Sequence, residues 1–328
     1  MKRMILILVM ACALSGCQPP TSPTPAPPPP PPPPPVVVVP DPPTVACPAP
    51  VAVSTTAASV VVTFATPAAE GGKEPVEVAC SPASGTMFAV GSTEVRCTAT
   101  DALQQTGSCG FPVKVTSIAT ITKTRFLAFG DSVTVGVVAT LNPSGMPFYI
   151  LRDVPNESYP TVLQRLLATR YASQAIAVSN EGKGGEKAVD GIGRAQSVIN
   201  GQRPEVVLIL DGYNDLGAGE AGIQPAISAI NEMAKDARFR GAKVFLATMT
   251  PPRTDVNRGI SNATVVRFNE ALRVMARGEN AVLVDLYAAM SGNAALYNSD
   301  DNRHPNEAGY KKMAETFFAA IQAALEVR

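Results

Sequence analysis

The pattern of apolar and polar positions divides the chain into segments of different character. An apolar run, Met4–Leu14, follows two basic residues, and a proline-rich stretch comes next. Short Val- and Thr-rich runs then alternate with turn residues, and the remainder alternates apolar runs with stretches of helical period. We therefore predict a signal peptide at 1–16, a linker at 17–43, a small β domain at 44–118 and a larger α/β domain at 119–328.

The larger domain has the pattern of a parallel sheet covered by helices. Its apolar runs are continuous rather than alternating, as in strands that are buried on both faces. Strands are expected at 124–130, 175–179, 205–211, 242–249 and 281–286, and helices at 159–171, 188–199, 223–238, 263–276 and 305–325. This alternation predicts an α/β fold, in which functional groups gather at the carboxyl ends of the strands.

One stretch, residues 138–158, interrupts the alternation of strands and helices. It contains Pro143, Gly145 and Pro147, followed by the apolar Phe148-Tyr149-Ile150. These residues are compatible with the wall of an acyl pocket, with a lid or with an inert surface loop. The sequence does not separate these three interpretations.

The small domain has the pattern of a β-sandwich. Strands are expected at 59–64, 76–80, 94–98 and 111–115, and turns at Gly71-Gly72, Ser84-Gly85, Val90-Gly91-Ser92 and Thr106-Gly107. Stretches of helical period are absent from this part of the sequence. Several short strands at such spacing are typical of a sandwich of two sheets.

Composition narrows the possible chemistry. The 328 residues include 27 Lys and Arg, 27 Asp and Glu, and a single histidine, His304. One histidine cannot build a two- or three-histidine zinc site, and we expect neither a metal nor an organic cofactor. A formal net charge of zero means that the chain lacks the excess of basic residues expected of a nucleic-acid-binding protein. A histidine general base, if the protein uses one, must be His304.

The N-terminus predicts export and lipid attachment. Met4–Leu14 is too short to span a bilayer and suits a signal peptide. The sequence Leu14-Ser15-Gly16-Cys17 resembles the lipobox of bacterial lipoproteins, which implies cleavage before Cys17 and acylation of that residue. An ordinary secretory signal with an incidental cysteine is the alternative. Because Gln18 follows the cysteine, the resemblance implies a lipid-anchored protein of the bacterial cell envelope, at the outer membrane.

The linker is expected to be extended. It contains an unbroken proline run, Pro27–Pro35, which has no backbone N–H donors for helices or sheets. Such a run favours polyproline II, so we interpret residues 17–43 as a semi-rigid stalk. A ligand for a proline-binding domain is the alternative interpretation.

Four cysteines remain for the small domain once Cys12 and Cys17 are set aside. They are Cys47, Cys80, Cys97 and Cys109, and an even number in an exported domain favours two disulfides. The sequence permits three pairings. We favour Cys80–Cys97, which closes a hairpin-sized loop, with Cys47–Cys109, which ties the ends of the domain.

The small domain also resembles a known module. Cys80-Ser81-Pro82, residues 91–97, Ala99-Thr100-Asp101 and Cys109–Val113 are similar to the hyalin repeat (HYR) module, and the match covers about 44–117. The resemblance implies an immunoglobulin-like β-sandwich linked to adhesion or spacing. We find no catalytic cluster here, so a structural spacer is favoured over a module that binds a cell-surface ligand.

The ends of the predicted strands of the larger domain carry the parts needed for acyl transfer. Ser132 follows the first strand as a hydroxyl at a strand-to-helix turn. Its own N–H, a backbone N–H at Gly185 and the side-chain amide of Asn214 are candidate donors to an oxyanion. His304 is a candidate base for the serine, and Asp301 precedes it by three residues and can hold its Nδ1–H. Each piece alone is a common turn or cap, and only their occurrence together favours catalysis.

This arrangement resembles the SGNH (GDSL-type) hydrolase superfamily over about 122–326. Gly130-Asp131-Ser132, Gly185, Asn214 and Asp301–His304 match its four blocks, with Val133 where leucine or isoleucine is usual. The resemblance implies a flavodoxin-like three-layer α/β/α sandwich. It makes Ser132 the nucleophile, Gly185 and Asn214 the remaining oxyanion donors, and Asp301 and His304 the rest of a triad.

The resemblance implies an ester hydrolase of the lipase or esterase type that works without a cofactor. Its substrate would be an acyl ester of a small molecule, a lipid or a glycan. A carbohydrate O-deacetylase of the same superfamily is one alternative. An adhesion lipoprotein that acts through the HYR-like module is another, and the complete set of triad residues argues against it.

Overall fold

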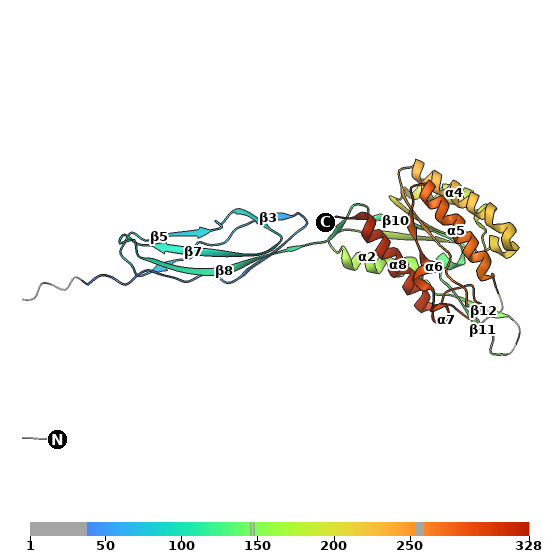
Figure 1. Cartoon of the computed structure of the whole chain (residues 1–328), viewed down its shortest axis with the longest axis horizontal. Coiled ribbons are helices and arrows are strands. Elements are labelled where there is room, and N and C mark those ends of the chain that lie inside the picture. Colours follow the sequence, from blue (N-terminus) through green and yellow to red (C-terminus); the bar gives the residue numbers. More distant parts are fainter. Residues whose placement is uncertain (1–37, 145, 147, 254–258, 328) are drawn as a thin grey trace, which may run out of the picture.

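The computed structural model describes residues 38–144, 146, 148–253 and 259–327 of the chain. Figure 1 shows a β-rich region in the N-terminal part and a region of helices and strands in the C-terminal part. The predicted signal peptide, Cys17 and the Pro27–Pro35 run lie outside the described residues. No helix in the described part of the chain has the length and apolar character needed to cross a membrane.

A five-stranded parallel sheet forms the centre of the C-terminal region. Its strand order is β13 (Ala177–Gly182), β10 (Arg125–Gly130), β14 (Val206–Leu210), β15 (Lys243–Ala247) and β16 (Val282–Val284). All five residues of β14 are buried, which is why its sequence is a continuous apolar run. The chain therefore builds the sheet in the order 2-1-3-4-5 of flavodoxin-like folds, as the resemblance implied.

Helices cover this sheet (Figure 1). The long helices are α2 (Tyr159–Arg170), α3 (Ala188–Gln202), α4 (Ile223–Phe239), α5 (Asn262–Gly278) and α8 (Glu307–Leu325). Helix α2 packs on α8, where the rings of Tyr159 and Phe317 stack with their centroids 4.9 Å apart. Helix α4 packs between α3 and α5. The shorter elements are α1 (Ser132–Val135), a 3-10 helix at Asp215–Gly222, α6 (Leu286–Met290) and α7 (Ala294–Tyr297).

The insertion at 138–158 contains an antiparallel hairpin. Strand β11 (Val137–Leu141) pairs with β12 (Tyr149–Asp153) beside the main sheet. A separate short pair, β9 (Thr120–Ile121) with β17 (Glu326–Val327), joins the start of the region to its end. Helix α8 begins at Glu307 rather than at Pro305, because Asn306 caps it by accepting a hydrogen bond from the Gly309 N–H.

The N-terminal region is an immunoglobulin-like arrangement of small sheets. One sheet has the order β2 (Val51–Thr55), β8 (Thr106–Ser117), β7 (Gly91–Thr100) and β5 (Glu77–Ser81). Strands β3 (Ser59–Val62) and β6 (Thr86–Ala89) form a second sheet, and β1 (Thr44–Val45) pairs with β4 (Ala69–Glu70). The buried core includes Val62, Phe88, Val95, Phe111 and Val113.

One of the turns expected from the sequence was wrong. The chain does bend at Val90, between β6 and β7, as expected for Val90-Gly91-Ser92, but Thr106-Gly107 lies within β8. The turn between β7 and β8 is formed instead around Asp101, whose carboxylate accepts hydrogen bonds from the N–H groups of Leu103 and Gln105. An aspartate that bonds to the following backbone organises this turn without glycine, so a glycine was the wrong signal to follow.

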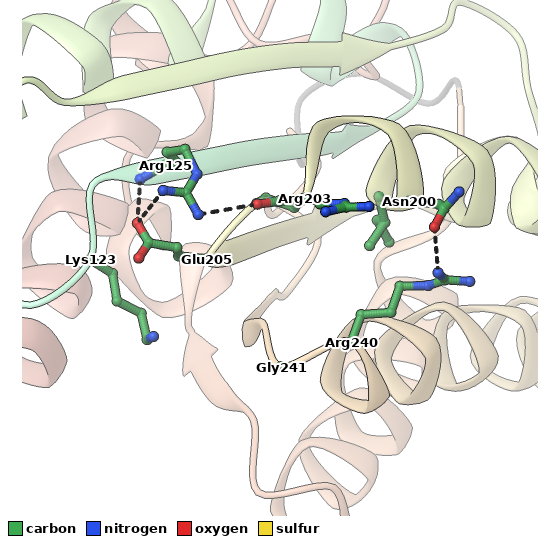
Figure 2. Close-up of a pocket in the computed structure, with 9 residues that line it drawn as sticks. Lys123, Arg125, Asn200, Arg203, Glu205, Arg240 and Gly241 are labelled. Atoms are coloured by element: carbon green, nitrogen blue, oxygen red, sulfur yellow. Dashed lines mark hydrogen bonds and ion pairs between the residues drawn. The ribbon is translucent and has the colours of Figure 1, made fainter.

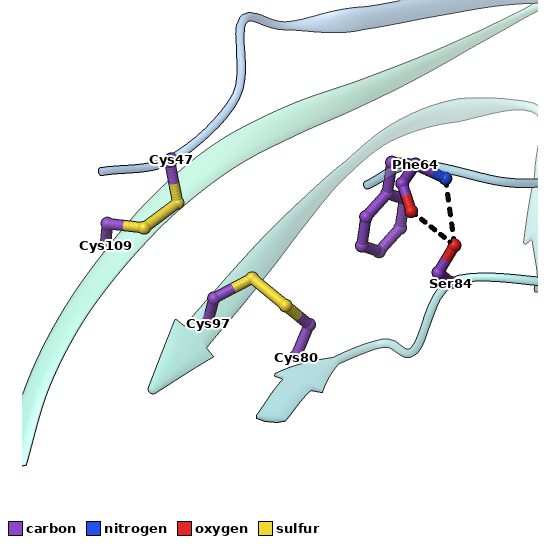
Figure 3. The surroundings of a disulfide bond; sticks show 6 residues. All are labelled: Cys47, Phe64, Cys80, Ser84, Cys97 and Cys109. Atoms are coloured by element: carbon purple, nitrogen blue, oxygen red, sulfur yellow. Dashed lines mark hydrogen bonds between the residues drawn. A yellow bond between two sulfur atoms is a disulfide. The ribbon is translucent and has the colours of Figure 1, made fainter. Parts of the chain in front are cut away.

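Two disulfides stabilise this region (Figure 3). Cys47 is joined to Cys109 and Cys80 to Cys97, which is the pairing that the sequence analysis favoured. Cys97 lies opposite Cys80 on one neighbouring strand and opposite Cys109 on the other. Strand pairing alone therefore allows a second partner for Cys97.

We predict that peptide mapping of the unreduced protein will recover these two cross-links. Replacing Cys47 and Cys109 together by alanine should lower the free energy of unfolding of the region by about 4 kcal/mol, because a cross-link between residues 62 positions apart restricts the unfolded chain strongly. Urea unfolding followed by circular dichroism measures this change. A Cys97–Cys109 cross-link in the map would contradict the pairing.

Candidate active site

Ser132 is the first residue of α1 and is separated from the end of β10, the second strand of the sheet, only by Asp131. A Cβ at Gly130 would collide with the carbonyl oxygen of Leu210 in β14 and with Thr134 Oγ1 in α1, and one at Gly182 would collide with the backbone N of Val135 in α1. Glycine at both positions therefore lets α1 lie against the sheet. Asp131 caps the short helix, because its Oδ1 accepts a hydrogen bond of 2.9 Å from the Val133 N–H.

The structure brings Ser132, His304 and Asp301 into one chain of hydrogen bonds. Ser132 Oγ lies 2.9 Å from His304 Nε2, and His304 Nδ1 lies 2.6 Å from Asp301 Oδ2. Ser132 is 9% exposed and His304 is 5% exposed, so the contact between them is largely shielded from water. With the ring proton on Nδ1, His304 has a free lone pair on Nε2 for the serine proton.

Asp301 is held as an ionised acceptor. Burial raises the pKa of its carboxyl, but the hydrogen bond from His304 and the N–H groups of His304 and Arg303 outweigh burial and leave the pKa below its ordinary value. Asp301 Oδ1 accepts both backbone N–H groups, at 3.0 and 3.1 Å. This local turn fixes the carboxylate so that Oδ2 faces the imidazole.

The loop that carries His304 is tied together by its own backbone. The Ser299 N–H donates to the carbonyl oxygen of His304 at 2.8 Å, and the Ser299 hydroxyl donates to that of Pro305 at 3.0 Å. Asn298 donates from Nδ2 to the carbonyl oxygen of Pro251, beyond β15. These bonds hold His304 just ahead of α8, above the carboxyl end of the sheet.

The two other predicted donors follow the strands on either side of β10. Gly130 is in register with Gly182 of β13 and with Leu210 of β14, so Gly185 and Asn214 follow neighbouring strand ends a few residues later. Gly185 has a φ of +75°, a conformation that favours glycine. Asn214 Nδ2 donates one N–H to the Glu186 carbonyl oxygen at 2.9 Å, and its second N–H has no hydrogen-bond partner among the described residues.

Arg194 of α3 holds the loop that contains Gly185, and the sequence analysis did not identify it. Its guanidinium donates to the carbonyl oxygens of Glu181 and Gly130, at 2.7 and 3.2 Å, and pairs with the carboxylate of Glu186. It also lies 4.1 Å from the ring centroid of Phe129. Because most of these partners are backbone or ring atoms, no residue pattern could have revealed the role.

Two carboxyls near Ser132, those of Asp131 and Asp211, are buried. Burial raises the pKa of Asp131, and burial together with the charge of Asp131 raises the pKa of Asp211 well above its ordinary value. The Oδ2 atoms of both have no hydrogen-bond partner among the described residues. The charge of His304 acts in the opposite direction and lowers the pKa of Asp131.

A pocket of about 480 Å³ lies where β10 and β14 begin, at the end of these strands opposite to Ser132 (Figure 2). Three of its charged side chains interact with other parts of the protein: Glu205 accepts from the Thr124 N–H at 2.9 Å and faces Arg125, and Arg240 donates to Asn200. The residues that line it include neither Ser132 nor His304. Among the described residues, no group of three or more metal-ligating side chains comes together.

Known proteins resemble both parts of the chain. The model of the GDSL-like lipase/acylhydrolase family matches residues 128–312, and the HYR domain model matches residues 39–115. The multidomain esterase of Ruminococcus flavefaciens is 24% identical over 127 residues, which are 38% of this chain but only 16% of that protein. The chain thus spans a small part of the length of this curated relative.

Solved structures agree on the fold. The lipase/acylhydrolase from Enterococcus faecalis aligns with a TM-score of 0.50 and 20% identity, over 62% of this chain and 97% of that one. At this identity the likeness shows the fold alone. The match to the GDSL-like lipase/acylhydrolase model shows the family, because it covers more than half of the 328 residues and contains both Ser132 and His304. The chain therefore belongs to the GDSL-like lipase/acylhydrolase family, a family of ester hydrolases.

Proposed function

We propose that this protein hydrolyses carboxylic esters through a Ser132–His304–Asp301 triad and an acyl-enzyme intermediate. The observation that carries the proposal is the continuous hydrogen-bond chain from Ser132 Oγ through the imidazole to Asp301 Oδ2, at 2.9 and 2.6 Å. A hydroxyl, a base and an oriented acceptor in this order are the parts that nucleophilic acyl transfer requires.

The first half of the reaction acylates the serine. Nε2 of His304 takes the proton of Ser132 Oγ as that oxygen attacks the carbonyl carbon of the ester. Asp301 accepts from Nδ1–H throughout and stabilises the imidazolium that forms. Nε2 then returns the proton to the leaving alcohol as the ester C–O bond breaks. His304 then deprotonates a water molecule, which attacks the acyl carbon. The bond between that carbon and Ser132 Oγ breaks, Nε2 returns the proton to Oγ, and the carboxylic acid leaves.

The oxyanion that develops on the carbonyl oxygen needs donors opposite His304. We assign this role to the N–H groups of Ser132 and Gly185 and to the free N–H of Asn214 Nδ2. Support comes from their positions after three neighbouring strands and from Arg194, which braces the Gly185 loop. Removing one donor of this type typically raises the barrier by about 3–4 kcal/mol.

Substitutions at the triad test the mechanism. Ser132→Ala and Asp301→Asn should each lower kcat for a p-nitrophenyl ester by about 10⁴-fold, the first by removing the nucleophile and the second by releasing the imidazole tautomer. Ser291→Ala, which changes an exposed serine at the end of α6, should keep the rate of the unchanged protein. Steady-state kinetics measure these effects, on variants whose circular dichroism spectrum matches that of the unchanged protein. Full activity of Ser132→Ala would refute the triad.

We further propose that Cys17 carries a lipid that attaches the protein to the outer membrane of a bacterial cell, with 17–43 as a stalk and the HYR-like region as a spacer. The proposal rests on the sequence, since residues 1–37 lie outside the described structure. Several acyl chains, at about 0.8 kcal/mol for each buried CH₂, would hold the protein firmly on a bilayer.

Cell fractionation tests the anchor. Cys17→Ser should shift the protein from the membrane fraction to the soluble fraction and abolish labelling by radioactive palmitate, because the acylated thiol is lost. Cys12→Ser is the matched control, since this residue belongs to the predicted signal peptide and should leave the mature protein unchanged. A palmitate label that persists on Cys17→Ser would exclude Cys17 as the site of lipid attachment.

A further inference from the structure

A pocket of about 560 Å³ lies between the β11–β12 hairpin and the triad loop. Phe148, Tyr149 and Leu151 line it from the hairpin, and Asp301, Arg303 and His304 line it from the loop. The catalytic imidazole is therefore part of the wall of this pocket. The pocket is large enough for a group of several carbon atoms.

The hairpin presents apolar side chains to solvent on an unusual scale. Five large hydrophobic residues between 141 and 151 are from 45% to 63% exposed, namely Leu141, Met146, Phe148, Ile150 and Leu151. Side chains alternate between the two faces of β12, so Tyr149 and Leu151 share one face and Ile150 lies on the other. Phe148 and Leu151 line the pocket beside His304, and exposed apolar residues that gather at one site mark a binding surface.

The hairpin is fixed to the catalytic loop. The Asp300 N–H donates to the Ala139 carbonyl oxygen at 3.2 Å, and Asp300 Oδ2 accepts from the Leu141 N–H at 2.9 Å. From α8, the Tyr310 hydroxyl donates to the Val137 carbonyl oxygen at 2.6 Å. The apolar wall is thus held in a set position relative to His304, as a preformed binding site requires.

The chemistry of the triad decides which part of an ester enters the pocket. His304 Nε2 must return its proton to the oxygen of the departing alcohol, so that oxygen lies against the imidazole. The carbonyl oxygen points to the donors at Gly185 and Asn214, on the other side of Ser132. The group that continues from the alcohol oxygen therefore extends along the wall formed by His304.

We propose that this pocket binds the alcohol portion of the substrate and selects esters of apolar alkyl or aryl alcohols. The inference rests on the ester hydrolysis proposed above and adds the substrate class. Phe148 and Leu151 are its specificity-determining residues, and they act by removing the apolar surface of the alcohol from water. Sugars and other strongly hydrated alcohols have little apolar surface to remove from water, so the apolar side of the pocket does not favour the binding of their esters.

Two isomeric esters test the assignment. Hexyl acetate and methyl heptanoate contain the same atoms, but the first places its chain in the alcohol and the second in the acyl group. Full-length protein and its Phe148→Ser/Leu151→Ser variant are assayed on both in a pH-stat, with methyl acetate as the reference. The control variant Phe239→Ser/Val274→Ser changes two exposed apolar residues on α4 and α5, away from the pocket.

The unchanged protein should hydrolyse hexyl acetate with a kcat/KM about tenfold or more above that for methyl acetate, since each fully buried methylene contributes about fourfold. The pocket variant should lose most of this gain, so that its ratio of kcat/KM for hexyl acetate to kcat/KM for methyl acetate falls, whereas its ratio for methyl heptanoate to methyl acetate should not change. The control variant should behave like the unchanged protein.

A pocket variant that loses methyl heptanoate instead of hexyl acetate would overturn the assignment to the alcohol. An unchanged ratio of hexyl to methyl acetate in that variant, or a preference of the unchanged protein for acetylated sugars over hexyl acetate, would overturn it as well. The proposed function fails separately, since it predicts hydrolysis of methyl acetate by every one of these proteins and its loss in Ser132→Ala.

Discussion

The close contact between the turn that carries Ser132 and the sheet is the constraint on which the proposed active site depends. Gly130 and Gly182 face each other in the register of two neighbouring strands, and a side chain at either position would strike backbone. Because neither glycine has a side chain, α1 lies directly on the sheet, and Ser132 lies above the carboxyl ends of the strands. The remaining groups of the site are arranged around that fixed point.

Each neighbouring element contributes one group at this edge of the sheet. The loop after β13 carries Gly185, the loop after β14 carries Asn214, and the loop before α8 carries His304 with Asp301. Arg194 ties the Gly185 loop to the end of β10, and Asp300 ties the triad loop to the hairpin. The proposed chemistry therefore depends on contacts between loops, and these loops all lie at the same edge of the sheet.

Much of this arrangement could be predicted from the sequence. Buried parallel strands require continuous apolar runs, so the strands and the polar residues at their ends were visible. The β11–β12 hairpin was not predicted, because residues such as Leu141 and Ile150 point to solvent and leave no pattern of burial. Arg194 was missed because its partners are largely backbone carbonyls. The strand register, in which Cys97 lies between Cys80 and Cys109, could not be predicted from the sequence either.

The central claim is that Ser132 is an activated nucleophile, and covalent labelling tests it most directly. A fluorophosphonate transfers its phosphorus group only to a serine whose hydroxyl is deprotonated by a neighbouring base. Mass spectrometry of the treated protein should find a single adduct, on the peptide that contains Ser132, and denatured protein should carry none. An adduct on a different residue, or ester hydrolysis that continues while Ser132 stays unlabelled, would contradict the account.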